Sequence, residues 1–245
     1  MTGTDFRRRE FADGEALAIA LANWTAELLR EAIAARGVAL LIVSGGKSPA
    51  RFFDLLSNSD LEWSRVDITL ADERRVADDS PRSNARLVRE RLLRNRAQAA
   101  KFTALADVRL PEDEELAAAR LRIANLPAPA DVVILGMGDD GHTASWFPGA
   151  DGLAGAMDPG ARQLVAPIVA KDAPEPRLTL TGRVILRARA IALEIQGEAK
   201  LATFSLALKT GSQEAMPIRA VLRGATDRLT VFMSPPAEVS AVVRD

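Results

Sequence analysis

Short apolar runs that end in glycine or charged residues, separated by stretches of helical periodicity, are the strongest constraint on how this chain folds. Two of the runs are continuous, at residues 38–43 and 132–135. Continuous apolar runs of this length are typical of strands that are buried on both faces of a parallel sheet. Strands that alternate with helices along most of the chain predict a mainly parallel, Rossmann-like sheet with helices on both faces. We therefore expect a three-layer α/β/α fold, formed as one domain over residues 1–245.

Capping and turn residues bound the other expected elements. One helix is expected to follow an N-cap at Asp13 and to stop at Gly37, and a short helix ending near Leu56 is expected to be capped by Ser48. The pattern predicts further strands at residues 66–71, 101–105, 164–169, 177–180, 190–196 and 229–233. It predicts further helices at residues 84–94 (with Ser83 as the cap), 112–124, 182–187 and 198–209. Residues 149–160 are rich in glycine, alanine and aspartate, which indicates a mobile surface loop.

Composition excludes several classes of protein. The net charge of −1 offers no general basic footprint for nucleic acid or an anionic membrane, and Arg7 to Arg9 are expected to form a solvated terminus. The chain has no cysteine, which excludes disulfides, thiolate catalysis and zinc–thiolate sites. Acidic residues interrupt any secretory pattern after Arg9, and no apolar run approaches the roughly 18 residues of a membrane span. We expect a cytoplasmic protein.

The single histidine, His142, lies in the motif at residues 131–148, where an apolar strand runs into three glycines and two aspartates. Open α/β sheets bind ligands at the carboxyl ends of their strands, and histidine exchanges protons near neutral pH. A structural histidine is the plain alternative. A zinc site lacks a second histidine or a cysteine, and a serine nucleophile at Ser145 lacks the Gly-x-Ser-x-Gly turn. A general base acting on water remains, with Asp139 or Asp140 to fix its tautomer.

The loop Ser44-Gly45-Gly46-Lys47-Ser48 follows a strand and opens a helix. Its glycines let backbone N–H groups approach an anion, and Lys47 and the serine hydroxyls add donors, which predicts a phosphate site. It is not a nucleotide P-loop, because the first glycine of that pattern would fall at Leu41. A plain strand-to-helix turn is the alternative.

Charged residues follow another expected strand at Asp72-Glu73-Arg74. A carboxylate there could orient or accept a proton, and an arginine could hold phosphate or developing negative charge. A solvated charged loop is the alternative. Arg177 and Lys200 are ordinary surface charges unless their strand ends bring them to the same anion.

Together these segments resemble the 6-phosphogluconolactonase family. The matching stretches occur in the family's order, at residues 44–49, 72–76, 83–84, 136–148, 177–179 and 197–200. The resemblance implies the fold of glucosamine-6-phosphate deaminase and the hydrolysis of 6-phospho-D-glucono-1,5-lactone, the second step of the oxidative pentose phosphate pathway. It implies no organic cofactor, no metal and no partner beyond the small-molecule substrate, in a monomer or small homo-oligomer. Lys47 and Trp146 depart from the family's commonest residues and are expected to tune substrate fit.

The resemblance also implies roles for individual residues. His142 would take a proton from the attacking water, with Asp140 and Asp72 as catalytic carboxylates. Asp72 would help position His142 or a substrate hydroxyl. Gly138, Asp139 and Gly141 would bind the oxyanion or support the loop. The phosphate would be held by the glycine loop together with its cations, namely Ser44, Gly45, Gly46, Lys47 and Ser48 with Arg74, Arg177 or Lys200.

Two other functions share this fold. A glucosamine-6-phosphate deaminase typically follows its histidine with an Asn-Glu-Pro segment, whereas residues 145–148 here are Ser-Trp-Phe-Pro and carry no carboxylate. A non-catalytic sugar-phosphate sensor usually adds a DNA-binding domain. The chain has no basic helix–turn–helix pattern and little room for such a domain before Val38.

Overall fold

The two continuous apolar runs form neighbouring strands at the centre of a parallel sheet. In the computed structural model, which describes residues 6–46, 48–171 and 173–235, β2 (Ala39–Val43) pairs with β3 (Val66–Leu70) and with β6 (Val132–Gly136). The other strands are β1 (Arg7–Glu10), β5 (Lys101–Thr103), β9 (Ala190–Gln196) and β10 (Leu229–Ser234). The sheet order is β1-β10-β9-β6-β2-β3-β5, and every pairing in it is parallel.

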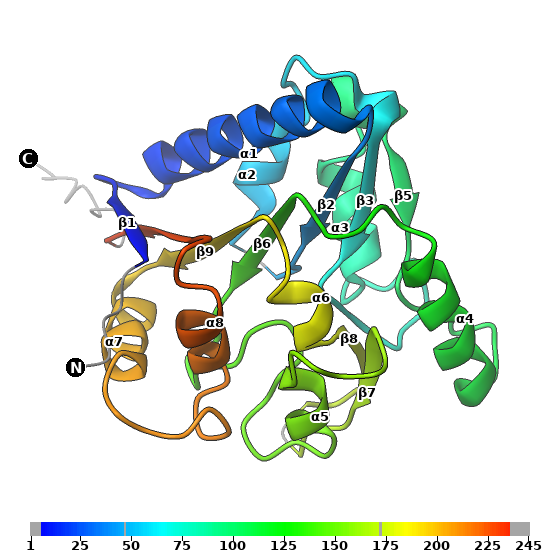
Figure 1. Ribbon diagram of the computed structural model, residues 1–245, viewed down its shortest axis with the longest axis vertical. Helices are drawn as coiled ribbons and strands as arrows, with labels where there is room; N and C mark the ends of the chain where they lie inside the picture. The colour runs from blue at the N-terminus through cyan, green and yellow to red at the C-terminus, as the bar shows by residue number, and fades with distance from the viewer. Residues whose placement is uncertain (1–5, 47, 172, 236–245) are drawn as a thin grey trace, which may run out of the picture.

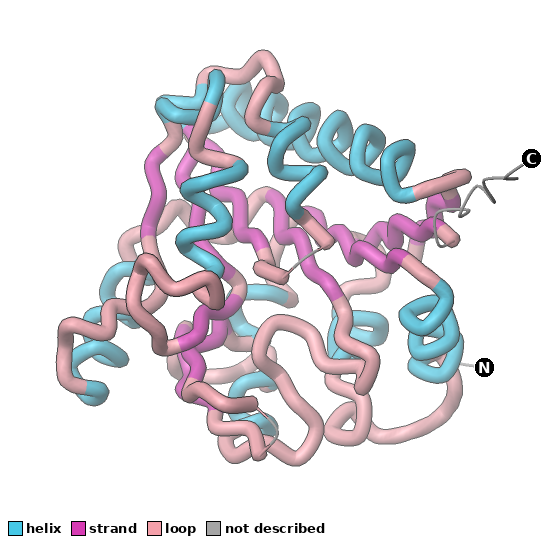
Figure 2. Tube along the Cα trace, turned by 180° about the vertical axis from the view of Figure 1, so that it is seen from behind, coloured by secondary structure: helices cyan, strands magenta, loops and turns pink. Residues whose placement is uncertain are grey.

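Helices cover both faces of this sheet, so the expected three-layer α/β/α architecture is confirmed. Figure 1 shows α1 and α2 above the sheet and α6, α7 and α8 below it, and Figure 2 shows the strands from behind, between the helical layers. The helices are α1 (Gly14–Arg36), α2 (Ala50–Leu56), α3 (Asn84–Arg91), α4 (Glu112–Ala124), α5 (Leu153–Met157), α6 (Gly182–Ile185), α7 (Glu198–Ala207) and α8 (Ile218–Gly224). No helix in the described ranges is long and apolar enough to cross a membrane.

The expected capping residues of α1 and α3 are confirmed. The Asp13 side chain accepts a hydrogen bond from the Ala16 N–H at 2.8 Å, and the Ser83 side chain accepts one from the Arg86 N–H at 3.1 Å. Gly37 ends α1 with φ of 77°, the left-handed conformation that favours glycine. Ser48 caps nothing, because α2 begins at Ala50 with Pro49 at its N-cap, so that expectation was wrong.

A second, antiparallel sheet of three strands lies outside the main one, and the sequence did not reveal it. Its order is β4 (Asp72–Arg74), β8 (Arg177–Leu180) and β7 (Val165–Ile168). The register places Arg74 opposite Arg177 and Asp72 opposite Thr179. This pairing brings together two charged segments that are far apart in the sequence.

One expectation about a loop was wrong. Residues 149–160 contain α5, whose Leu153, Ala156 and Met157 are buried. These side chains recur at helical spacing, so the segment packs one face inward instead of forming an open loop. The sequence analysis also predicted no element at α8, in which Ile218 to Leu222 are buried.

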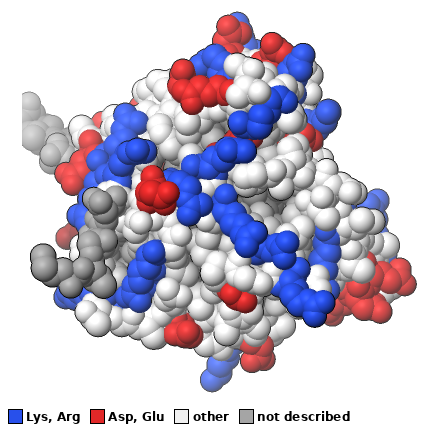
Figure 3. Space-filling view, in the orientation of Figure 1, with Lys and Arg blue, Asp and Glu red and all other residues white. Residues whose placement is uncertain are grey.

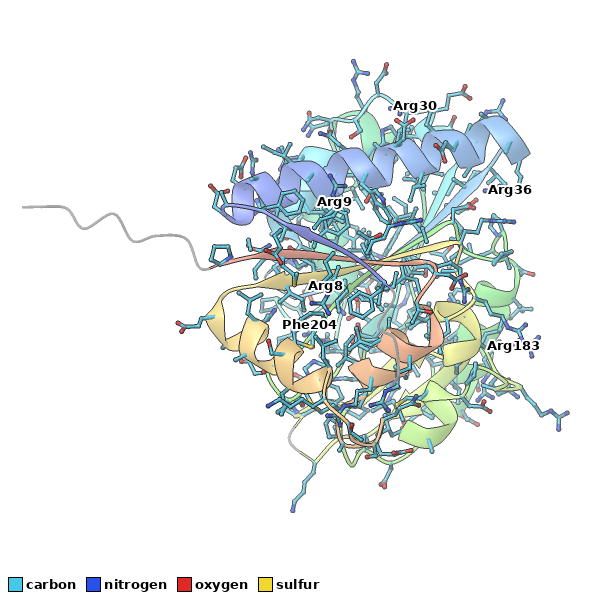
Figure 4. The ribbon with its side chains drawn as sticks, turned by 60° about the vertical axis from the view of Figure 1, so that its left-hand side comes forward. Arg8, Arg9, Arg30, Arg36, Arg183 and Phe204 are labelled. Atoms are coloured by element: carbon cyan, nitrogen blue, oxygen red, sulfur yellow. The ribbon has the colours of Figure 1, made fainter. Side chains whose placement is uncertain are left out.

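The arginine run near the start of the chain is also different from the expected solvated terminus. Residues Arg7 to Glu10 form the edge strand β1, which pairs with β10. The Arg8 guanidinium lies 5.2 Å from the Phe6 ring centre and 5.9 Å from that of Phe204, and Figure 4 shows Arg8 and Phe204 on β1 and α7. Arginine can cover aromatic rings in this way while its charge stays hydrated.

Charge is unevenly distributed although the net charge is −1. Figure 3 shows basic side chains across the middle of one face, with most acidic side chains nearer its rim.

The buried carboxylate of Asp131 forms ion pairs with two arginines, Arg189 and Arg36, the latter labelled in Figure 4 at the end of α1. Asp131 also accepts the buried Leu40 N–H at 2.9 Å, which ties the start of β2 to the start of β6.

Replacing Asp131 with alanine is expected to lower the free energy of unfolding by about 1–3 kcal/mol, because the buried Leu40 N–H loses its acceptor. Urea unfolding at pH 7 measures the change. Asp227→Ala is the matched control, since Asp227 is exposed and pairs with its sequence neighbour Arg228. Equal midpoints and slopes for Asp131→Ala, Asp227→Ala and the wild type would contradict this role for Asp131.

Candidate active site

The order of the strands creates a crevice between the loops that follow β2 and β6. After β2 the next strand of the main sheet is β3, on one side, whereas after β6 it is β9, on the other side, so the two loops diverge at the carboxyl ends. Ligands bind at such a switch point in open α/β sheets. A cavity of about 340 Å³ lies there, within the usual range for small-molecule sites.

Most of the residues predicted from the sequence line this cavity. The lining includes Ser44, Gly45, Gly46, Ser48, Asp72, Arg74, Gly138, Asp139, His142, Arg177 and Lys200. Asp140 and Gly141 lie in the same loop as His142 but not in the lining, and Lys47 lies outside the described residues. Five separate parts of the sequence therefore converge on one space.

A tight turn after β6 sets the position of His142. The Gly138 N–H donates to the His142 carbonyl at 2.9 Å, and the Gly141 N–H donates to the Gly138 carbonyl at 3.0 Å. Gly141 has φ of +81°, and a Cβ at Gly138 would lie 2.1 Å from the imidazole Cε1. Gly138 thus makes room for the ring, and Gly141 permits the turn. Because both N–H groups are used within the loop, neither is free to bind an oxyanion in this conformation.

Asp140 is the carboxylate that holds His142. Its Oδ1 accepts the His142 backbone N–H at 2.9 Å and lies 2.6 Å from the imidazole Nδ1. A carboxylate acceptor at Nδ1 favours the tautomer with the proton on that nitrogen, which leaves Nε2 able to accept a proton. The ring also packs against Phe147, with 4.3 Å between the ring centres.

The charge of Asp140 is favoured by this contact. Burial raises the pKa of Asp140, but hydrogen bonds from the His142 side chain and backbone lower it by more, so the pKa lies below its ordinary value. A lowered carboxyl pKa contributes stability above the ordinary pKa of aspartate. That contribution is lost as the pH falls through the lowered pKa.

Asp72 has different partners. Its Oδ2 accepts the Ser145 hydroxyl at 2.5 Å and lies 3.8 Å from Nη1 of Arg177. Within the described ranges, Asp72 makes no hydrogen bond to His142. Ser145 is fully buried against Asp72, so it is not placed as a nucleophile beside the imidazole.

Two cations line the wall on the side of the small sheet. Arg177 is buried, its guanidinium lies 4.9 Å from the Phe147 ring centre, and its Nε has no hydrogen-bond partner among the described residues. Burial lowers the pKa of Arg177 and Asp72 raises it by less, yet a guanidinium stays charged in proteins. Arg74 donates from Nη1 to the Arg82 carbonyl at 2.6 Å.

A third cation of the lining lies beside the glycine loop. Lys200 of α7 donates to the Ser48 hydroxyl at 3.2 Å. The loop itself requires glycine twice, since Gly46 has φ of +98° and a Cβ at Gly45 would lie 1.8 Å from Oδ1 of Asn84. The glycine loop, Ser48 and Lys200 thus form one donor-rich wall.

Several lining residues were not identified from the sequence. Asn84 follows the helix cap Ser83, and its amide donates to the Asp72 carbonyl at 2.8 Å while its buried Oδ1 has no partner among the described residues. Glu194 is a charged residue inside an apolar strand, and this break in the apolar pattern was the sequence signal that could have identified it.

Trp146, which was expected to tune substrate fit, is fully buried outside the lining and donates to the Leu180 carbonyl at 3.1 Å.

Glu73 serves the fold, although it adjoins Asp72. Its carboxylate accepts the N–H groups of Arg74, Asn84 and Ala85 at 2.8, 2.9 and 2.7 Å, which ties β4 to the start of α3. Burial raises the pKa of Glu73 above its ordinary value despite these three N–H donors.

No cluster of three or more His, Cys, Asp or Glu side chains in the described parts of the chain is arranged to hold a metal ion.

Comparison with known proteins identifies similar chains. The model of the family described as glucosamine-6-phosphate isomerases/6-phosphogluconolactonase matches residues 12–231. The 6-phosphogluconolactonase of Mesorhizobium japonicum is 46% identical over 96% of this chain and 98% of its own. A crystal structure of a 6-phosphogluconolactonase from Shewanella baltica aligns with a TM-score of 0.88 and 43% identity, over 95% of this chain and 98% of that one. A monomeric glucosamine-6-phosphate deaminase shares the fold, with a TM-score of 0.76 and 19% identity over 94% of this chain and 97% of that one.

Replacing Asp140 with alanine is expected to remove the bias of His142 toward the tautomer protonated on Nδ1, because the carboxylate acceptor is lost. Nitrogen-15 NMR of labelled imidazole measures the tautomer directly, and the signal is unambiguous because the chain has one histidine. Asp139→Ala is the control, since the Asp139 side chain makes no hydrogen bond to the ring in the described structure. An unchanged tautomer in Asp140→Ala would contradict the assignment.

Proposed function

The chain belongs to the family of glucosamine-6-phosphate isomerases and 6-phosphogluconolactonases, and we propose from this that it hydrolyses 6-phospho-D-glucono-1,5-lactone to 6-phospho-D-gluconate. The observation that carries the proposal is the single histidine, which Asp140 holds at the edge of a cation-lined cavity. Relatives named 6-phosphogluconolactonase that are up to 46% identical over nearly the whole chain support the same activity. The reaction is the second step of the oxidative pentose phosphate pathway.

In the proposed reaction, His142 acts as a general base through Nε2. It takes a proton from water as the water oxygen attacks the lactone carbonyl carbon, and a tetrahedral oxyanion forms. The bond from that carbon to the ring oxygen then breaks, and the ring oxygen takes the proton back from Nε2 and becomes a hydroxyl. The new carboxylic acid releases its own proton to solvent. Asp140 keeps the ring oriented in both steps.

Arg177 is the group best placed to stabilise the oxyanion. Its guanidinium and the His142 ring both lie against Phe147, and the cavity wall buries it from bulk water. A fixed cation in a poorly hydrated site stabilises developing negative charge more than one in water does. We assign Asp72, with Ser145, the role of holding Arg177 in place.

We assign the phosphate group of the substrate to the wall formed by the glycine loop, Ser48 and Lys200. Backbone N–H groups of Gly45 and Gly46, the hydroxyls of Ser44 and Ser48, and the Lys200 ammonium supply donors there. Arg74 lines the same cavity and adds charge from the small sheet. Lys47 remains part of the proposal on the basis of its place in the loop.

A glucosamine-6-phosphate deaminase is the second candidate, because that activity shares the family and the fold. The segment after His142 argues against it, since residues 145–148 offer no carboxylate to the imidazole. The sensor alternative has no observation in its favour.

We also propose a single domain over residues 1–245, because β1 and β10 come from opposite ends of the chain and pair in one sheet. The cytoplasmic location and the oligomeric state stay predictions.

Wild-type protein is expected to accelerate decay of the lactone, generated in situ from glucose 6-phosphate, above its spontaneous rate. His142→Ala is expected to lower kcat by about 10²–10⁴-fold, the usual contribution of a general base. Circular dichroism checks that the variant is folded. Full turnover by folded His142→Ala would remove the general-base role. No acceleration by folded wild type would reject the lactonase, and release of ammonia from glucosamine 6-phosphate would then support the deaminase.

Lys200→Ala is expected to raise KM by about 10–100-fold, because a hydrogen bond to a charged group contributes about 1.5–3 kcal/mol. The effect on kcat is expected to be smaller, since the phosphate lies away from the reacting carbonyl. Steady-state kinetics with the same lactone assay separate the two constants. Lys209→Ala is the matched control, because Lys209 is an exposed lysine just beyond the same helix. Equal KM values for the two variants would remove Lys200 from the phosphate site.

A further inference from the structure

Glu194 is a buried acid in the cavity wall that the proposed chemistry leaves unused. It lies near the carboxyl end of β9, and the residue is 2% exposed. Its register partner on β6 is Gly136, where an added Cβ would meet no atom within 4 Å. The absence of a side chain at Gly136 leaves open space on that side, and Glu194 contributes to the cavity lining there.

The carboxyl group has few partners. Gln196, two residues further along β9, donates from its side-chain amide to Oε1 of Glu194. Oε2 has no hydrogen-bond partner among the described residues. Burial raises the pKa of Glu194, and the hydrogen bond from Gln196 and the positive charge of Lys200 lower it by less. The group therefore accepts a proton more readily than an ordinary glutamate does.

Glu194 and Lys200, the cation of the proposed phosphate site, line the same cavity. The ammonium group is bonded to Ser48, and within the described ranges it forms no ion pair with Glu194. A phosphate that binds at Lys200 would add negative charge close to a carboxyl group that is shielded from water. Two like charges in such a site repel strongly, whereas a protonated carboxyl group can donate a hydrogen bond to an oxygen of the ligand.

We propose that Glu194 takes up one proton from solvent when a phosphate ester binds, and that its O–H then donates to a phosphate oxygen. The proposal rests on the proposed phosphate site at Lys200. Glu194 is then a specificity residue that links phosphate affinity to pH. As the pH rises, loss of this proton weakens binding of the phosphorylated ligand, while the steps at the lactone carbonyl are served by other groups.

Other charged groups share the cavity and must be held constant in any test. They are Asp72, Arg74, Asp139, His142, Arg177 and Lys200. Lys200 is the one among them that acts on the pKa of Glu194. A substitution at Glu194 alone leaves all six in place, so the difference between wild type and variant isolates the proton of Glu194.

Glu194→Gln is the informative change, because glutamine has the shape and neutrality of the protonated acid and an N–H donor in place of its O–H. Binding of inorganic phosphate and of 6-phospho-D-gluconate is measured by calorimetry from pH 6 to 9, in buffers of different ionisation enthalpy. The wild type is expected to take up as much as one proton more per ligand than Glu194→Gln. Its affinity is expected to fall with pH more steeply, by up to about tenfold per unit. D-gluconate, which lacks the phosphate, is the control ligand.

Glu194→Asp keeps an ionisable group and is expected to keep the proton uptake, which a purely structural role would not predict. In lactone assays the pH-dependent difference between wild type and Glu194→Gln is expected in KM rather than in kcat. Equal proton uptake and parallel affinity profiles for wild type and Glu194→Gln would overturn the inference. Should Glu194→Gln not fold, Glu194→Met provides the same comparison without the ionisable group. Failure of the proposed function appears separately, as a folded wild type that does not accelerate lactone hydrolysis.

Discussion

The pairing of β2 with β6 is the interaction on which the rest of the site depends. These strands come from distant parts of the chain, and their ladder is extended at one end by Asp131 bonding to Leu40 and at the other by the Ser44 N–H donating to the Ile134 carbonyl at 3.0 Å. The glycine loop and the histidine loop are thereby fixed side by side. Since both strands are buried, a shift of register would expose apolar side chains and separate the loops, so core packing and site geometry are maintained by the same contacts.

The two sides of the cavity are built by different means. Lys200 and the glycine loop belong to the main sheet and its helices, whereas Arg74 and Arg177 come from the small antiparallel sheet. Positive charge in the cavity lining thus comes from both sheets, while the imidazole and Asp140 belong to the loop that follows β6. In the proposed reaction, one group of cations would hold the anionic substrate and another would stabilise the charge that develops on it.

Much of this could be predicted from the sequence because the signals were local. The apolar runs gave the central strands, and Asp13, Gly37 and Ser83 gave helix ends through hydrogen bonds that span three or four residues. The position of β1 could not be predicted, since its four residues are exposed and only the distant β10 makes them a strand. The same contrast between local signals and distant contacts applies to the residues of the candidate site. The motifs indicated which residues gather, and the partner of His142 is the nearby Asp140 of the same loop. The burial of Arg177 and the place of Glu194 depend on contacts between segments that no local pattern records.

The position of β1 also has a consequence for the order in which the fold can form. β2, β3 and β5 follow one another closely along the chain and can pair soon after they are synthesised. β1 is made before all of them, but its one neighbour in the sheet, β10, is made after every other strand. On the ribosome, therefore, the first strand must wait, with its arginines in water, until the last strand has emerged. The charged sequence of β1 suits this delay, because an apolar edge strand left unpaired for as long would invite aggregation.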